Sequence, residues 1–524
     1  MQKRPRPQTS SMTGKYMMNP ARFRPFLILM TGTLLLAGCQ VGPKYHAPSA
    51  TTQAPPAIYK ETPANFPESD TWKPAQPQDA MLRGKWWEIY NDPELNDLED
   101  QLNVNNQTIK QSFENFMAAR SLIAQAHSQL YPTIATAPSY TRSQASANVG
   151  SSATGAARPR QSGVTSLPVS ASWEPDLWGR VRSLIHEEQY NAQLSASDLE
   201  NQKLTEQATL AVTFFEIRGQ DALIDVFQHT VDADKKALDL ARSRYETGVD
   251  DQISVVEAEN TLQNAQAGLT NLGVARAQYE HAIATLIGKS ASDFAMPGKA
   301  LKATPPAIPL GVPSQLLQRR PDIAAQERSM AAANAQIGIA IAAFYPNITI
   351  SASGGLESST FKHLFDWPSR FWSVGPGISE TIFDAGLRRA TVNQYEAAYN
   401  ADVAAYRQTV LTAFQQVEDA LSSVRIVSNQ IKQQEEAEKS ALRFFELETG
   451  RYQTGIDPYV NLVTAQTTLL ADQQTLTSLR TQHMTASVQL IEALGGGWDS
   501  SQLPSSADVS KKINRDDPAL QPQN

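Results

Sequence analysis

Short segments in each half of the chain alternate apolar residues with small polar ones, which is the two-residue period of a β-strand. The clearest apolar positions are Leu167, Val169, Ala171, Trp173, Ile348, Ile350, Ala352, Trp372, Val374, Pro376 and Ile378, with Ser, Thr, Gly or Pro between them. We therefore predict two β-hairpins of two strands each, over 133–175 and 347–382, of which 133–142 is the least regular strand. An apolar face opposite a small polar face suits a strand between lipid and a water-filled lumen.

A half-exposed sheet of a soluble protein would show the same alternation, so the flanking residues decide between the two interpretations. Aromatic side chains gather at the ends of the predicted strands, as they do at the two interfaces of a membrane. They are Tyr131, Trp173, Trp178, Phe344, Tyr345, Trp367, Phe371, Trp372 and Phe383. We therefore place the hairpins in a membrane. Four strands cannot close a barrel, and unpaired edges are costly in lipid, so several subunits must share one barrel.

Between the hairpins lie stretches that are rich in Ala, Leu, Gln and Glu and that favour helices. We predict helices over 93–130, 180–244, 250–287, 313–343, 387–451 and 457–494. The two longest would each be roughly 100 Å long at about 1.5 Å per residue. Each of them ends at a tip turn, 245–250 or 452–457, after which the next helix runs back. We expect the Pro-rich segment 297–312 to cross halfway along the helices as an equatorial link.

The same order of helices and hairpins occurs twice because the chain contains an internal repeat. The heptapeptide RYETGVD at 244–250 returns as RYQTGID at 451–457, an offset of 207 residues. Further glycines, alanines and threonines upstream and downstream of it share this offset. We assign the two repeats to 93–296 and 313–497, and we expect 498–524 to be a flexible tail.

The beginning of the chain is typical of a signal peptide. Its first 38 residues contain six Lys or Arg and no acidic residue, and an apolar run precedes Leu36-Ala37-Gly38-Cys39. That ending resembles the bacterial lipobox, in which the cysteine is lipidated and becomes the first residue of the mature protein. Gln40 in the next position is typical of a lipoprotein of the outer membrane. We predict lipidation at Cys39, the alternative being a buried thiol, and an extended, partly equatorial segment over 39–92.

The whole chain is mildly acidic and not strongly hydrophobic. Its mean hydropathy is −0.36, and the absence of a long apolar run after residue 38 excludes a polytopic helical membrane protein. The formal charge is −8, and removal of the first 38 residues would leave 39 Lys+Arg against 53 Asp+Glu, or −14. This balance argues against a nucleic-acid partner. A single cysteine excludes a disulfide framework and a multi-cysteine metal site.

Residues that could support catalysis form no recognisable constellation in the sequence. The seven histidines lack metal-ligand spacing. A Gly-x-Ser-x-Gly elbow is absent, and Gly375-Pro376-Gly377 lacks the third glycine and the following helix of a dinucleotide site. We therefore predict that the protein is not an enzyme and uses no metal or cofactor.

Several motifs together resemble one protein family. They are Trp86-Trp87, Asp92-Pro93-Glu94-Leu95, the run LLQRRPDI at 316–323, the paired tip turns and the lipobox. Over 39–497 the chain resembles the outer membrane factors, the TolC-like channel-tunnels, in their OprM/NodT lipoprotein branch. The resemblance implies a mainly α-helical homotrimer with a small β part. Each chain would contribute long antiparallel helices to a tunnel and four strands to a shared twelve-stranded transmembrane barrel.

The resemblance also implies a function and partners. We expect a lipid-anchored channel of the outer membrane with a large periplasmic part, which conducts substrates passively out of a tripartite efflux system. Its partners would be a periplasmic adaptor protein and an inner-membrane pump of the RND, ABC or MFS type. Two alternatives stay open: a structural or adhesive coiled-coil lipoprotein without a lumen, and the outer-membrane component of type I polypeptide secretion. No motif identifies the transported substrate.

The tip turns carry the candidate functional residues. The resemblance implies a gate at the periplasmic end, which we assign to Tyr452, Asp457, Asn461, Thr464, Thr467 and Glu257. Family members have acidic residues where this chain has Asn461 and Thr464, and the OprM/NodT branch has an arginine where it has Thr467, so we expect a less charged aperture. Contact with the adaptor is assigned to Arg244, Tyr245, Gly248, Asp250, Arg451 and Gly455. The alternative is ordinary turn chemistry, in which glycines adopt positive φ and Asp250 and Asp457 cap the following helices.

Overall fold

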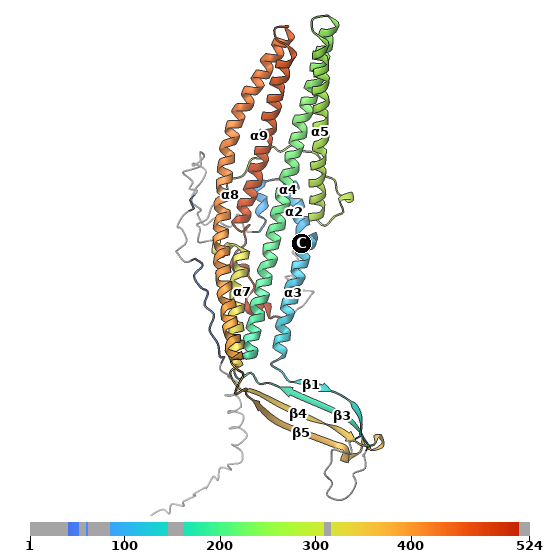
Figure 1. Ribbon diagram of the computed structural model, residues 1–524, viewed down its shortest axis with the longest axis vertical. Helices are drawn as coiled ribbons and strands as arrows, with labels where there is room; N and C mark the ends of the chain where they lie inside the picture. The colour runs from blue at the N-terminus through green and yellow to red at the C-terminus, as the bar shows by residue number, and fades with distance from the viewer. Residues whose placement is uncertain (1–39, 52–58, 61–83, 145–160, 309–315, 513–524) are drawn as a thin grey trace, which may run out of the picture. The chain divides into compact units, whose positions relative to one another are not determined.

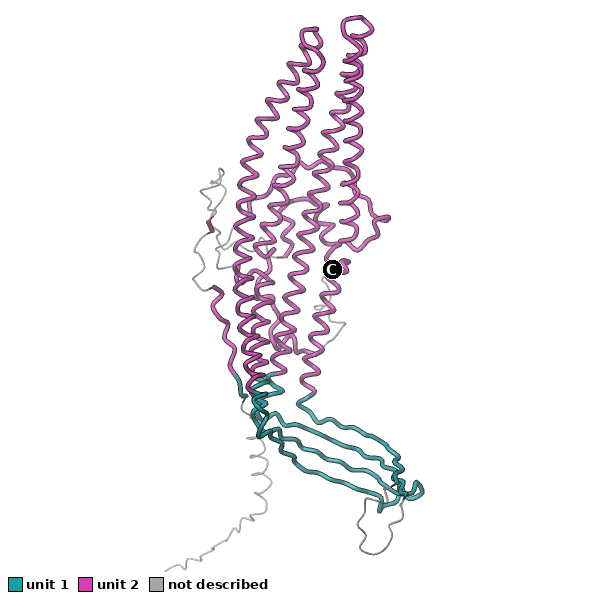
Figure 2. Tube along the Cα trace, in the orientation of Figure 1, with its two compact units in different colours: residues 1–42, 129–183, 338–388 teal, residues 43–128, 184–337, 389–524 magenta. Residues whose placement is uncertain are grey.

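A computed structural model describes residues 40–51, 59–60, 84–144, 161–308 and 316–512. The predicted signal peptide, Cys39 and the far end of the predicted tail lie outside the described residues. The chain divides into two compact units (Figure 2). The first is a sheet unit of residues 1–42, 129–183 and 338–388, and the second is a helical unit of residues 43–128, 184–337 and 389–524.

The sheet unit contains five antiparallel strands. They are β1 (Thr133–Thr136), β2 (Ser139–Gln144), β3 (Gln161–Trp173), β4 (Asn347–Ser358) and β5 (Arg370–Ser379). Both β1 and β2 pair with β3, and the order across the sheet is β1-β3-β4-β5. The predicted single strand over 133–142 is therefore wrong in detail, because it is interrupted at Pro138, which has no N–H to donate to the ladder. The sheet remains four strand positions wide.

The register of the strands separates an apolar from a polar face. Trp173 lies opposite Ile350, and Ala352 opposite Val374, so these side chains share one face. On the other face Ser353 lies opposite Ser373, and their hydroxyls are 2.8 Å apart. Among the described strands, β1 and β2 leave one edge of the sheet unpaired and β5 leaves the other. Strands of other subunits could pair with these edges.

Helices make up almost all of the second unit (Figure 1). They are α2 (Pro93–Asn105), α3 (Gln107–Ser128), α4 (Arg180–Glu246), α5 (Gln252–Leu286), α6 (Leu316–Arg319), α7 (Pro321–Ala342), α8 (Leu387–Gln453), α9 (Tyr459–Ala493) and α10 (Ser506–Val509), of which α4 and α8 begin within the sheet unit. Helices α4 and α8 have 67 residues each, or roughly 100 Å. Helix α5 runs back beside α4, and α9 beside α8 (Figure 1). Within the described residues no helix is both long and apolar enough to cross a membrane.

The helices predicted over 93–130 and 313–343 are each broken, at Asn106 and Arg320. The Asn106 side chain accepts from Ile109 N–H at 3.0 Å and donates to the Leu286 carbonyl at 2.9 Å. The Arg320 guanidinium donates to the Ala493 carbonyl at 3.0 Å. Each side chain thus donates a hydrogen bond to a carbonyl at the C-terminal end of a returning helix. If the helix continued without the break, its side chain could not be placed at that carbonyl.

The predicted flexible tail is also corrected, because its described part packs on the helices. Val509 of α10 lies in a buried cluster with Phe116 and Met117 of α3. Arg120 of α3 donates to the Val509 carbonyl at 3.2 Å and to the Lys511 carbonyl at 2.9 Å. These contacts join positions almost 400 residues apart in sequence, which local sequence patterns do not report.

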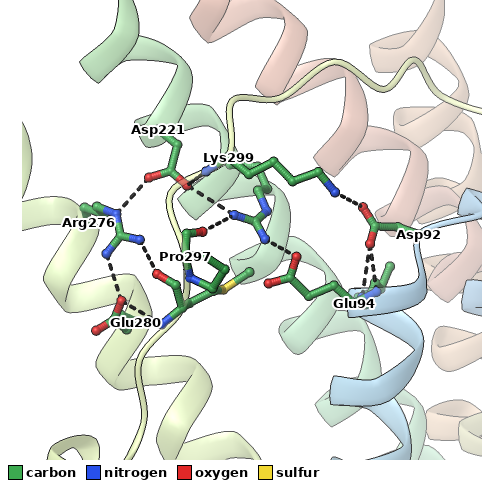
Figure 3. A network of polar contacts seen from close by, with 10 residues as sticks. Asp92, Glu94, Asp221, Arg276, Glu280, Pro297 and Lys299 are labelled. Carbon is green, nitrogen blue, oxygen red and sulfur yellow. Dashed lines mark hydrogen bonds and ion pairs between the residues drawn. The ribbon is translucent and has the colours of Figure 1, made fainter. Parts of the chain in front are cut away.

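The link after α5 is held by a buried network of charges (Figure 3). Arg218 of α4, with only 3% of its side chain exposed, pairs with Glu94 and with Asp221 at 3.2 Å. Its guanidinium also donates to the Pro297 carbonyl at 2.8 Å. Asp221 in turn accepts from Arg276 of α5 at 2.8 Å. The network therefore fixes where the predicted equatorial link 297–312 leaves the helices, up to residue 308, where the described part of the link ends.

Candidate functional site at the hairpin tips

The two tip turns have the same backbone conformation. Gly248 and Gly455 adopt φ values of +73° and +77°, which side-chain-bearing residues rarely adopt. One residue later, Val249 N–H donates to the Arg244 carbonyl and Ile456 N–H to the Arg451 carbonyl, both at 2.9 Å. These bonds satisfy carbonyls that the helix ends leave free. The repeat therefore places equivalent side chains at equivalent positions on both tips.

The tips of the two hairpins are joined by three side chains, which we call the tyrosine clasp: Arg244 and Asp250 of the first repeat and Tyr452 of the second. The Tyr452 hydroxyl donates to Asp250 Oδ2 at 3.0 Å. The Arg244 guanidinium lies over the Tyr452 ring, 4.7 Å from its centre, and donates to the Tyr452 carbonyl at 2.7 Å. Arg244 Nε is 3.4 Å from Asp250 Oδ2. Tyr452 is fully buried in this arrangement.

The electrostatics of the clasp favour a neutral tyrosine and an ionised aspartate. Burial and then the hydrogen bond to Asp250 raise the pKa of Tyr452 well above its ordinary value. Desolvation would raise the pKa of Asp250, but hydrogen bonds from Ser254 and Tyr452 outweigh it and lower that pKa. At neutral pH the tyrosine hydroxyl therefore donates to a carboxylate, which makes a charge-assisted hydrogen bond.

Beneath the clasp lies an apolar tip cluster from all four long helices. Its buried members are Leu238, Ala241, Ala258, Tyr452, Tyr459 and Leu462. The rings of Tyr452 and Tyr459 meet edge to face at 5.3 Å. Further from the tip, the buried carboxylate of Asp234 on α4 accepts a hydrogen bond from Gln466 on α9. Burial raises the pKa of Asp234 to about 6. Sequence reasoning missed this second contact between hairpins, because nothing local marks Asp234 as buried.

The predicted gate residues are only partly brought together. Tyr452 lies in the clasp, whereas Asp457 pairs with Arg451 of its own turn, with 3.0 Å between Arg451 Nη2 and Asp457 Oδ1. Three others are exposed along one face of α9: Asn461, Thr464 and Thr467. The two threonine hydroxyls donate to carbonyls of their own helix at 2.8 Å. Glu257 is half-buried on α5.

The predicted capping roles of Asp250 and Asp457 are wrong. The residue that caps α5 is Asp251, which accepts from Ser254 N–H at 3.1 Å. Helix α9 begins after Pro458, which has no side-chain cap. Asp250 is free to join the clasp because its neighbour caps the helix.

The predicted adaptor-contact residues fall into two groups. Arg244 and Asp250 are mostly covered by the clasp, with 14% and 17% of their side chains exposed. The other four residues of this set are exposed: Tyr245, Gly248, Arg451 and Gly455. A sequence signal for Arg244 and Asp250 does exist. A buried tyrosine in the turn of one repeat needs a hydrogen-bond acceptor, and the equivalent turn of the other repeat supplies Asp250. In the described part of the chain, no group of His, Cys, Asp or Glu could hold a metal ion.

The sequence matches the family model described as "Outer membrane efflux protein" at two places, residues 98–289 and 312–496. The chain belongs to this family. One similar outer membrane efflux protein is the "Antibiotic efflux pump outer membrane protein ArpC" of Pseudomonas putida, 31% identical over 91% of this chain and 96% of the relative. Another is the "Toluene efflux pump outer membrane protein TtgC", also of P. putida, with the same identity and coverage. The solved structure of the outer-membrane channel OprN is 25% identical and superimposes with a TM-score of 0.77, covering 88% of this chain and 100% of that one.

These comparisons bear on several of the predictions from sequence. The two matched segments confirm the internal repeat, and the match itself confirms the family resemblance. The likeness to OprN confirms the fold class of this outer membrane efflux protein, a helical tunnel with a small β part. The relatives confirm its place in the outer membrane and its work in efflux.

Proposed function

We propose that this protein is the outer-membrane exit duct of a tripartite efflux system, working as a homotrimer with a periplasmic adaptor and an inner-membrane pump. The observation that carries the proposal is the tyrosine clasp, which joins the two long hairpins at their free ends. A contact of this kind suits hairpins that must be held together in one state and separated in another. The sheet with one apolar face and two open edges supports a barrel shared by three chains, with twelve strand positions.

The mechanism follows from what each part contacts. The clasp and the tip cluster hold the hairpins of one chain together, so the tip stays narrow until a partner competes for these contacts. A passive duct needs no cofactor, because the pump supplies the energy. Opening then requires a partner that binds the separated hairpins more tightly than the joined ones.

The adaptor contact is best placed at the outermost surface of the tips. Val249 and Ile456 occupy equivalent positions in the two turns and are 63% and 64% exposed. Apolar side chains with this exposure on both tips form a surface that an adaptor could cover. Gly248 and Gly455 lie beside them and allow close approach of another backbone.

The cargo is proposed to be small organic compounds, since two relatives act in antibiotic and toluene efflux. The exposed face of α9 near the tip presents Asn461, Thr464 and Thr467, none of which carries a charge. If this face lines the pore, the pore offers no ring of carboxylates there to hold a cation. Cargo would therefore meet no charged side chain at these three positions.

The proposal is tested by incorporating the purified protein into planar lipid bilayers. We expect discrete conductance steps that are small for the wild type, because the clasp keeps the tips together. Reversing a tip charge, as in Asp250→Lys, is expected to enlarge the steps. If neither protein gives discrete channels, the duct is excluded in favour of a lipoprotein without a lumen.

Attachment of lipid is proposed to depend on Cys39, the only cysteine and the last residue of the lipobox. A Cys39→Ser variant should incorporate no fatty-acid probe, whereas the wild type should be labelled. Labelling of the variant at the wild-type level would show that lipid is attached at another residue. The unlabelled variant should still be found in the outer membrane fraction, because the barrel is itself a membrane segment.

A further inference from the structure

The internal repeat gives every residue of the tyrosine clasp a counterpart 207 residues away. Arg244 and Asp250 correspond to Arg451 and Asp457, and Tyr452 corresponds to Tyr245. One half of a second clasp is already formed, because Arg451 and Asp457 are paired as Arg244 and Asp250 are. The other half is open. Tyr245 is 47% exposed, whereas Tyr452 is fully buried. The Tyr245 hydroxyl has no hydrogen-bond partner among the described residues.

Apolar residues near the clasp show the same difference between counterparts. On α8, Phe444 and Leu447 are 40% and 59% exposed, although their counterparts Ala237 and Leu240 on α4 pack against the tip cluster. On α5, Val256 is 55% exposed, although its counterpart Val463 on α9 packs against the same cluster. Each hairpin therefore has one covered flank and one bare flank. The bare flanks are repeat-related copies of the two surfaces that meet inside the chain.

A single chain cannot join its own bare flanks while the clasp is closed. The flank of the first repeat that carries Arg244 already meets the flank of the second repeat that carries Tyr452. The remaining flanks are exposed, one carrying Tyr245 and the other carrying Arg451. Two different surfaces that fit each other head to tail generate a closed ring when the rotation between copies closes. A neighbouring copy can therefore supply the missing partner.

We propose that Tyr245 of each protomer docks between Arg451 and Asp457 of the neighbouring protomer and forms a second clasp there. The inference rests on the trimer of the proposed function. In it, the Tyr245 hydroxyl donates to Asp457, and the Arg451 guanidinium covers the tyrosine ring, as Arg244 covers that of Tyr452. The apolar residues Phe444 and Leu447 of α8 are covered by the neighbour's α5. Three clasps within chains then alternate with three between chains around the tip.

This assignment changes the role of two residues. The sequence predicts that Tyr245 and Arg451 contact the adaptor, but here they are engaged between protomers. The surface that remains for the adaptor is then limited to the outermost apolar positions, such as Val249 and Ile456. Breaking the second clasp would loosen neighbouring chains from each other without separating the hairpins of one chain.

The experiment uses crosslinking between two differently tagged chains, one carrying Tyr245→Cys and the other Asp457→Cys. Cys39 is the only native cysteine, and it is consumed by lipidation in the proposed mature protein, so the background of free thiols is low. Chains co-expressed in one cell are purified through both tags and treated with a short bismaleimide. We expect a covalent dimer that contains both tags. The control pair, Tyr452→Cys and Asp250→Cys on separate chains, should give none, because that clasp forms within one chain.

Three outcomes are separable because trimer assembly is measured on the same samples by native mass spectrometry. Mixed trimers with a crosslink at 245 and 457 and none in the control support the second clasp. Mixed trimers without that crosslink, in which Tyr452→Cys and Asp250→Cys on one chain do react, overturn the inference and leave the duct intact. Absence of trimers overturns both. As a further readout, Tyr245→Phe should increase the ion leak severalfold over that of the wild type. Thr247→Ser in the same turn should not, because the serine hydroxyl can still donate to the carbonyls of Ser243 and Arg244.

Discussion

An Asp250→Ala variant is expected to conduct ions through tips that no longer close. The substitution removes the acceptor of the Tyr452 hydroxyl at 3.0 Å and the carboxylate beside Arg244 at 3.4 Å. It leaves a mostly covered guanidinium without its counter-charge and a buried hydroxyl without a partner. Losses of this kind cost about 2–4 kcal/mol. At about 1.4 kcal/mol per factor of ten, the open population should rise about 30-fold to several hundred-fold.

The measurement is the open probability in planar bilayers, accompanied by the sensitivity of cells to antibiotics that do not normally cross the outer membrane. Asp250→Asn should have a smaller effect, because the amide oxygen still accepts from Tyr452. Asp251→Ala is the matched control, since it removes only the side chain that caps α5. The Asp251 backbone N–H, which donates to Asp250 Oδ1 at 3.0 Å, is retained. An open probability of Asp250→Ala equal to that of the Asp251→Ala control would show that the clasp does not hold the tips.

Much of the architecture could be predicted from the sequence because its determinants are local and repeated. Two-residue alternation marks the strands, since their faces meet different surroundings. Long stretches without proline mark the two longest helices, α4 and α8, each of which extends two residues beyond its predicted end. The offset of 207 residues identifies the repeat without any structural information.

The errors arise where a tertiary contact overrides a local preference. The stretch around Asn106 favours a helix, yet the chain breaks there because the asparagine bonds the end of α5. The tail after Trp498 contains few strong helix or strand signals, yet Val509 and the Arg120 contacts hold it against α3. In both cases the contacting segments are far apart in sequence, so no window of neighbouring residues can predict the contact.

The same reasoning explains which part of the site the sequence predicts. Tyr452 is recognisable through its place in the turn motif, whereas the motif assigns its partners Arg244 and Asp250 to a different task. Pairing across two hairpins depends on which flanks meet, and a single sequence does not specify this. The repeat could narrow the number of residues that can pair across the hairpins. Both turns share one heptapeptide pattern, in which the acid at 250 and the tyrosine at 452 occupy different positions.

A Gly495→Ala variant is expected to lose about 2–5 kcal/mol of folding stability and with it most of the assembled protein. Gly495 ends α9 at φ +95°, where a side chain costs about 1–2 kcal/mol of backbone strain. An added Cβ would also lie 2.0 Å from the Arg319 carbonyl oxygen, in the turn before the break at Arg320. Because this neighbour is backbone, the overlap must be relieved by moving a helix, at about 1–3 kcal/mol.

Two further glycines separate the strain from the overlap in this prediction. Gly248→Ala shares the positive φ of +73° but has nothing within 4 Å of the added Cβ, so it should lose only the strain. Gly450→Ala lies within α8 with open space around it and should stabilise the protein slightly, as alanine favours a helix. The midpoint of thermal unfolding in detergent and the yield of trimer should therefore fall in the order Gly450→Ala, Gly248→Ala, Gly495→Ala. If Gly495→Ala instead unfolds at the same midpoint as Gly248→Ala, the carbonyl of Arg319 moves away without a cost in stability. The contact between the helix break at Arg320 and the end of α9 is then not rigid.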